Sequence, residues 1–149
     1  MKSIIKNRKA RHEYHVLETL EVGISLRGTE VKSLREGRAN LRDSYAVIRD
    51  GEVFLRGLHI SPYSHTSDGA LDPSRERKLL MHKIEIKRLI GKVQEKGLTL
   101  VAMQLYFNKR GIVKVELALA KGKRDYDKRH DLADRDAKRE MERAMKYKR

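Results

Sequence analysis

Apolar and polar residues alternate along the chain from residue 16 onward. Leu20, Val22, Ile24 and Leu26 are separated from one another by Glu, Gly and Ser. This period of two is typical of a strand that buries one of its faces. The segment beginning at Val16 is therefore the first predicted strand.

The same alternation, together with turn residues, predicts two hairpins. Asp50-Gly51 is a two-residue turn of the kind that joins antiparallel strands. Asn108–Gly111 separates the second pair, in which apolar residues again occupy every other position. The strands predicted for these hairpins are 43–49, 52–60, 98–107 and 112–120.

Two short helices interrupt the strands. The first follows Gly28, with Thr29 as its predicted N-cap and Gly37 at its end. The second has apolar residues at the i, i+3, i+4, i+7 spacing of a helix face and ends before Gly97. These apolar residues are Ile86, Leu89, Ile90 and Val93.

The elements predict a mainly β fold. Five or more strands with short hairpins and two or three small helices favour a mostly antiparallel barrel, and an open α+β sandwich is the alternative. Residues 61–75 hold both prolines of the chain and many small polar residues, so they form a loop.

Charge divides the 149 residues into three parts. The formal net charge is +14, of which residues 1–15 carry +4, residues 16–120 carry +5 and residues 121–149 carry +5. Large apolar residues lie almost entirely in the middle part. We therefore expect a basic N-terminal arm (1–15), a domain (16–120) and a basic C-terminal tail (121–149) that is disordered alone and helical against a partner. A solvated helix is the alternative for the tail.

Several classes of protein are excluded or disfavoured. No stretch approaches the roughly 20 apolar residues of a membrane span, and the N-terminus lacks the apolar core of a signal peptide. The chain has no Cys, so disulfides and thiolate metal sites are absent, which fits a cytoplasmic protein. His12 and His15 have the wrong spacing for a helical zinc site, and no catalytic motif occurs. We expect no metal, no cofactor, no membrane partner and no enzymatic activity.

Three basic clusters point instead to nucleic acid. They lie at residues 7–11, 75–78 and 121–129. Lys and Arg at this density neutralise phosphates and release counterions, which gives strong affinity that is blind to sequence. Tyr126 adds a ring that can stack on an exposed base, as recognition of unpaired RNA requires. Composition alone favours RNA over DNA only weakly.

Four segments carry a resemblance to one family. They are NRKARHEY (7–14), GTEVKSLREGRANLRDSYAVIRDGEVFL (28–55), DPSRERKLL (72–80) and ALAKGKRDYDKRHDL (118–132). Their order and content resemble the small protein B family, the SsrA-binding proteins of bacterial trans-translation. The resemblance implies an oligonucleotide-binding-type barrel with small helices.

The resemblance also implies a function and partners. Members are RNA-binding adaptors that hold the tRNA-like domain of transfer-messenger RNA and deliver it, with elongation factor Tu, to stalled ribosomes. Their tail enters the empty mRNA channel at the decoding centre of the small subunit, and the nascent chain is then tagged. We expect a cytoplasmic monomer. The competing hypothesis is a ribosomal or ribosome-assembly protein with basic tails that bind rRNA.

Carried over to this sequence, the resemblance implies two groups of residues. Glu21 can accept hydrogen bonds from base amino groups or 2′-hydroxyls, and Leu80 can pack on a base or ribose, although simple packing at the start of a helix is an alternative for Leu80. The expected contacts with transfer-messenger RNA are Arg8, Lys9, Arg11, Glu21, Lys32, Arg35, Arg77, Lys78, Leu80 and Lys114. The expected contacts of the tail with the decoding centre are Lys121, Lys123, Arg124, Tyr126, Asp127, Lys128 and Arg129.

Overall fold

A computed structural model describes residues 1–63, 71–94, 97–123 and 139. Within these residues the chain forms three helices, α1 (Arg8–Glu13), α2 (Gly28–Arg35) and α3 (Lys83–Val93). The strands are β1 (Lys2–Lys6), β2 (Tyr14–Ile24), β3 (Ala39–Asn40), β4 (Tyr45–Arg49), β5 (Glu52–Arg56), β6 (His59–Ile60), β7 (Arg77–Leu80), β8 (Leu98–Phe107) and β9 (Val113–Gly122).

The larger sheet closes into an antiparallel barrel. Its strand order is β1-β8-β4-β5-β7-β2-β9, and β9 also pairs with β8. One edge of β8 pairs with β9 along its length, whereas its other edge is shared between β4 and β1. The predicted barrel with small helices is confirmed, and the open sandwich is wrong because a closed ring leaves no free edge between β8 and β9.

The hairpin turns follow from local chemistry. Asp50 and Gly51 both have positive φ, 53° and 74°, as a two-residue turn that matches strand twist requires. At the second hairpin the Asn108 side chain accepts hydrogen bonds from the backbone of Arg110 and Ile112. Both predicted turns therefore fix the register of the strands that follow them.

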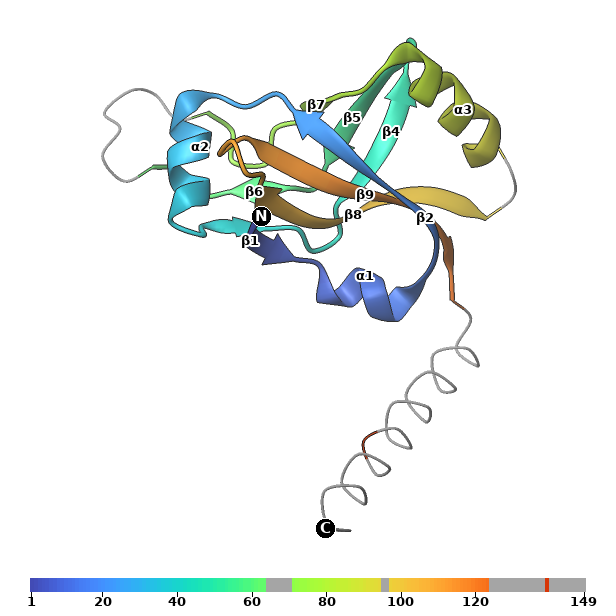
Figure 1. The fold of residues 1–149 in the computed structure, drawn as a ribbon, viewed down its shortest axis with the longest axis horizontal. Coiled ribbons are helices and arrows are strands. Elements are labelled where there is room, and N and C mark those ends of the chain that lie inside the picture. The colour runs from blue at the N-terminus through green and yellow to red at the C-terminus, as the bar shows by residue number, and fades with distance from the viewer. Residues whose placement is uncertain (64–70, 95–96, 124–138, 140–149) are drawn as a thin grey trace.

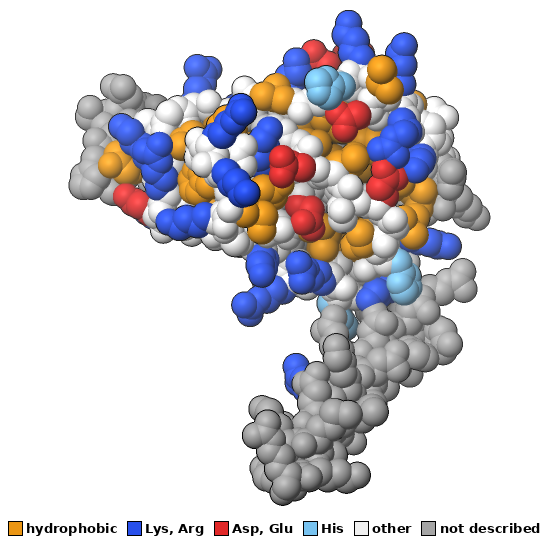
Figure 2. Space-filling view, viewed as in Figure 1, with side chains coloured by type: hydrophobic (Ala, Val, Ile, Leu, Met, Phe, Trp, Pro, Cys, Tyr) orange, Lys and Arg blue, Asp and Glu red, His pale blue; other side chains and the backbone are white. Residues whose placement is uncertain are grey.

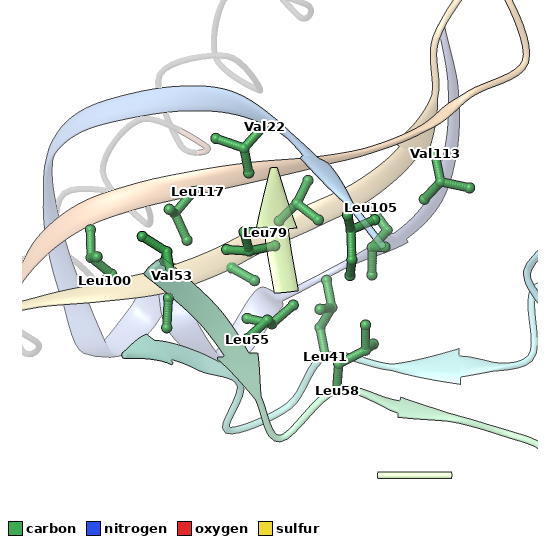
Figure 3. Close-up of a cluster of buried hydrophobic side chains, with 14 of the residues drawn as sticks. Val22, Leu41, Val53, Leu55, Leu58, Leu79, Leu100, Leu105, Val113 and Leu117 are labelled. Carbon is green, nitrogen blue, oxygen red and sulfur yellow. The ribbon is translucent and has the colours of Figure 1, made fainter. Parts of the chain in front are cut away.

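The core lies inside the barrel. Figure 3 shows side chains from β2, β5, β7, β8 and β9 pointing toward one another. The predicted alternation holds here, because Val22, Val113 and Leu117 lie in the core cluster while their neighbours in sequence face outward. Helix α3 adds Ile86 and Leu89, two of the four apolar residues predicted for its inner face.

The N-terminal residues belong to the barrel rather than to a separate arm. Strand β1 pairs with β8, and α1 buries Ala10 against the outer side of β8 and β9. The outward residues Val101 and Ala118 are consequently buried as well. The arm predicted from charge over residues 1–15 thus contributes a strand and a helix to the fold, because its few apolar residues suffice to dock it.

Asn7 holds the start of α1 in place. Its buried side chain accepts from the backbone N–H of Ala10 and donates to the carbonyls of Leu41 and Ala102. This satisfies the amide at both ends, as burial requires. The first residue of the NRKARHEY segment is therefore an anchor of the fold.

Three element boundaries differ from prediction. Residues 77–80, of which Leu80 was a candidate for the start of a helix, form strand β7 between β5 and β2. Helix α2 begins at Gly28, and its N-cap is Arg27 rather than Thr29, because the Glu30 carboxylate accepts the Arg27 N–H at 2.8 Å. Strand β9 continues to Gly122, so the predicted tail begins inside the sheet.

A buried ion pair ties α2 to β7. Arg77 is 1% exposed and Glu30 is 5% exposed, and Arg77 Nε lies 2.7 Å from Glu30 Oε2. The remaining Arg77 nitrogens donate to the carbonyls of Leu58, Pro73 and Arg75, and Arg75 also pairs with Glu30. Burial raises the pKa of Glu30, but hydrogen bonds from Arg75, the Arg27 N–H and Arg77 outweigh it, so the pKa lies below its usual value.

We predict that Glu30→Gln lowers the free energy of unfolding by about 3–5 kcal/mol, because it leaves the Arg77 charge buried and uncompensated. Since folding depresses the pKa of Glu30, this contribution is present at neutral pH and is lost as the pH falls through the pKa of the folded state. Urea unfolding at a series of pH values should show the difference from wild type shrinking below about pH 4.

Glu52→Gln is the matched control, because Glu52 pairs with Lys78 at the exposed surface. It should change the free energy of unfolding little. Equal losses in the two variants would contradict a special role for the buried pair.

Candidate nucleic-acid interface

Three of the predicted RNA contacts meet on the outer face of the barrel around Gly23. Gly23 pairs with Leu80 of β7 on one side and with Lys114 of β9 on the other, and Glu21 lies two positions earlier on the same face. A Cβ at Gly23 would approach Leu80 Cβ to 3.1 Å, so glycine permits this close contact. Leu80 remains 53% exposed and is available to pack on a base or ribose.

Glu21 is held by a tyrosine from another strand. Tyr106 of β8 reaches across β9, and its hydroxyl donates to Glu21 Oε2. Burial raises the pKa of Tyr106 well above its usual value, and the hydrogen bond to the Glu21 carboxylate raises it further. The phenol therefore keeps its proton at neutral pH and donates, while Glu21 remains exposed and able to accept further hydrogen bonds.

A second carboxylate lies directly beside Glu21. Glu116 of β9 is the cross-strand partner of Glu21, and Gln104 of β8 is the partner of Glu116 on the other side. Gln104 Nε2 donates to Glu116 Oε2 at 2.9 Å. We name the Gly23 neighbourhood, comprising Glu21, Leu80, Tyr106, Lys114 and Glu116, the central patch.

The predicted contacts on α1 lie apart from the central patch. Arg8 and Arg11 are exposed, whereas Lys9 donates to Asp43 Oδ1 at 2.6 Å. Figure 1 shows α1 below the barrel, at the end toward which β9 leaves the sheet. Helix α1 can add phosphate contacts to an RNA that extends beyond the central patch.

Helix α2 carries Lys32 and Arg35 on its exposed side. The Lys32 ammonium lies 5.5 Å from the centre of the Tyr63 ring. Figure 1 shows α2 at the opposite end of the barrel from α3 and away from α1. The structure thus places the predicted basic residues on several surfaces instead of one.

Arg77 is not available to RNA. Its guanidinium is buried in the ion pair with Glu30, so the prediction that it binds RNA is wrong. Its neighbour Lys78 points outward, as alternation along β7 requires, and pairs with Glu52 at 2.9 Å. The resemblance placed both residues in one segment, and the strand geometry separates their roles.

Only the first part of the predicted tail lies within the described residues. Lys121 is exposed on β9 opposite His15, and the Lys123 backbone N–H donates to the carbonyl of Glu13. The other predicted decoding-centre contacts, Arg124, Tyr126, Asp127, Lys128 and Arg129, lie outside the described residues.

Sequence reasoning missed Tyr106, Gln104 and Glu116. The turn at Asn108–Gly111 could have placed Tyr106 beside Lys114, because it sets the register of β8 and β9. The link to Glu21 depends on pairing between β2 and β9, which are about 95 residues apart in the chain. Local pattern contains no signal for such a pairing.

The arrangement suits recognition of a polyanion with hydrogen-bond donors. Figure 2 shows Lys and Arg side chains spread over this face, with acidic side chains between them. Cations of this kind can supply affinity for phosphate, and carboxylates can accept hydrogen bonds from hydroxyl or amino groups. Among the described residues, no cluster of three His, Cys, Asp or Glu could hold a metal ion, and no helix is long and apolar enough to cross a membrane.

Comparisons with known proteins agree on one family. A family model described as SmpB protein matches residues 4–147. The SsrA-binding protein of Desulforamulus reducens is 62% identical over 145 residues, covering 97% of this chain and 90% of the relative. The SsrA-binding protein of Symbiobacterium thermophilum is 64% identical over 143 residues, covering 96% of this chain and 90% of the relative.

A solved structure gives the same result. One chain of the structure described as "tmRNA-SmpB: a journey to the center of the bacterial ribosome" is 55% identical, with a TM-score of 0.68. The likeness covers 81% of this chain and 85% of that chain. With sequence agreement over almost its full length and the same fold, the chain belongs to the SmpB protein family.

Proposed function

We propose that this protein is the RNA-binding adaptor of trans-translation, which binds the tRNA-like domain of transfer-messenger RNA and delivers it to stalled ribosomes for rescue and tagging. The observation that carries the proposal is the convergence of Glu21, Leu80 and Lys114 on one exposed face. These residues are far apart in the chain, and family resemblance assigned each of them separately to RNA contact. The names of the relatives, SsrA-binding proteins, support it.

The protein divides its work between two RNAs. The barrel, through the central patch and the exposed cations of α1 and α2, holds transfer-messenger RNA. The tail from Lys121 onward contacts the decoding centre through Lys123, Arg124, Tyr126, Asp127, Lys128 and Arg129, and residues 131–149 enter the mRNA channel. The likeness to a chain of the structure described as "tmRNA-SmpB: a journey to the center of the bacterial ribosome" supports an association with both RNAs.

Three further features belong to the proposal. The protein works as a monomer in the cytoplasm, delivers its RNA together with elongation factor Tu, and catalyses no reaction itself. Its contribution is binding and positioning, for which a barrel with exposed cations suffices.

We predict that Lys114→Ala weakens binding to the tRNA-like domain severalfold and lowers the slope of log affinity against log salt by about one, because one phosphate contact is lost. Fluorescence anisotropy over a salt series measures both. The thermal midpoint should stay close to wild type, since Lys114 is only half-buried. Lys2→Ala, which removes an exposed cation from β1, is the matched control and should bind normally.

We also predict that replacing Asp127, Lys128 and Arg129 with alanine leaves affinity for transfer-messenger RNA nearly unchanged and abolishes tagging on stalled ribosomes. The physical reason is that the proposed division assigns these residues to the ribosome and not to the delivered RNA. Reconstituted tagging and RNA-binding assays on the same variant check this. A parallel fall in affinity and tagging would refute the division between barrel and tail.

The alternative of a constitutive ribosomal or assembly protein predicts different behaviour on purified ribosomes. A delivered adaptor is substoichiometric and is released by a high-salt wash, because its contacts are largely electrostatic. A structural ribosomal protein stays bound in equal amount with the other subunit proteins. Quantifying the protein in washed ribosomes separates the two.

A further inference from the structure

Two carboxylates of the central patch face each other across neighbouring strands. Glu21 and Glu116 are direct cross-strand partners on β2 and β9, with both side chains on the outer surface. Like charges in this position destabilise a sheet. A pair that is locally unfavourable in this way is a feature expected at a functional site.

The two carboxylates also lack the cations that several other described acids have. Glu18 pairs with Arg88 and Lys92, and Glu76 pairs with Arg49 and Arg56. Within the described residues, no Lys or Arg forms a salt bridge with Glu21 or Glu116. Their negative charge therefore remains available in a protein whose partner is a polyanion.

Two neutral side chains of β8 hold both carboxylates in place by donating hydrogen bonds to them. Tyr106, 5% exposed, donates to Glu21 Oε2, and Gln104, 7% exposed, donates to Glu116 Oε2. Each donor takes one carboxylate oxygen. Among the described residues, no hydrogen bond is made to the second oxygen of either carboxylate, and the side-chain amide oxygen of Gln104 is a buried acceptor without a partner.

We propose that Glu21 and Glu116 form an acceptor pair that selects the bound RNA through its hydroxyl or amino donors, with Tyr106 and Gln104 as positioning residues. The inference rests on the proposed function and deepens it. Lys114, beside the pair in the same surface, contributes affinity for phosphate. Glu116 adds a specificity-determining contact to the one expected from Glu21.

The proposal is testable because it predicts whether neutralising a carboxylate raises or lowers the affinity for RNA. Neutralising an idle carboxylate beside a polyanion removes repulsion and tightens binding of every RNA. Neutralising a carboxylate that accepts from an RNA donor weakens binding of the cognate RNA, by about tenfold for a charged hydrogen bond. Glu116→Gln keeps the shape of the side chain and its acceptance from Gln104.

The experiment compares the affinity of the full-length protein for the tRNA-like domain and for an unrelated hairpin RNA of equal length. We expect Glu116→Gln to bind the tRNA-like domain about tenfold more weakly and the unrelated RNA equally or more tightly, with an unchanged or higher thermal midpoint. Tighter binding of both RNAs would overturn the proposal. Asp50→Asn, which neutralises a carboxylate in the β4–β5 turn, is the control and should not weaken either complex.

The source of the donor is distinguished with modified RNA. A tRNA-like domain transcribed with 2′-fluoro pyrimidines lacks those hydroxyl donors while keeping helical geometry. If the loss caused by Glu116→Gln disappears with this RNA, the donor is a 2′-hydroxyl of a pyrimidine nucleotide. If the loss persists, the donor is a base amino group or a purine hydroxyl.

A double-mutant cycle tests the positioning role. Tyr106→Phe keeps the buried ring, and if Tyr106 acts through Glu21, adding Tyr106→Phe to Glu21→Gln causes no further loss of cognate affinity. Additive losses would show that Tyr106 acts independently and would refute its role. If the wild-type protein does not prefer the tRNA-like domain over the control RNA, the proposed function itself fails, whatever the variants do.

Discussion

The pairing of β9 with β2 on one edge and β8 on the other is the constraint on which the rest of the structure depends. It closes the barrel and so encloses the core. It also decides which outward residues become neighbours, because register along β9 sets Glu116 between Glu21 and Gln104. The same strands thus build the interior with one face and the candidate RNA site with the other.

Charged residues in this protein fall into two physical groups. Arg77 and Glu30 are buried and paired with each other. Arg77 also donates to backbone carbonyls and Glu30 also accepts from Arg75 and the Arg27 N–H, so their charges serve the fold. Lys114, Glu21 and Glu116 are exposed or half-buried and have no salt-bridge partner among the described residues. The net charge of the sequence includes both groups. Only the structure distinguishes the buried, paired charges from the exposed charges that can contact a partner.

The sequence predicted the local elements well. The period of two, the Asp50-Gly51 turn and the helix spacing around Leu89 each depend on neighbours within a few residues, and each was confirmed. Errors arose where a distant contact decides the outcome. The N-terminal residues look like a basic arm until β8 supplies a partner for β1, and residues 77–80 become a strand because β5 and β2 flank them.

The candidate site was also predictable only in part, because its residues come from strands that are distant in the sequence. Family resemblance supplied Glu21, Leu80 and Lys114, and the barrel brought them together. Family resemblance also supplied Arg77. Because side chains alternate along β7, Arg77 points inward and Lys78 points outward. Tyr106 and Glu116 could not be found from pattern, since a tyrosine and a glutamate in an amphipathic strand are ordinary until their cross-strand partners are known.

A basic surface alone does not explain how one RNA is chosen among many. Contacts between cations and phosphate are available to every nucleic acid, so a net charge of +14 supplies affinity without selection. Selection requires groups that bind well only when a matching donor is present and that repel phosphate otherwise. A pair of fixed carboxylates meets both requirements, because each lowers the affinity for RNAs that place phosphate there and recovers it only through a hydrogen bond. On this proposal, the Glu21–Glu116 pair destabilises the pairing of β2 with β9, which closes the barrel, and in return allows the protein to discriminate between RNAs.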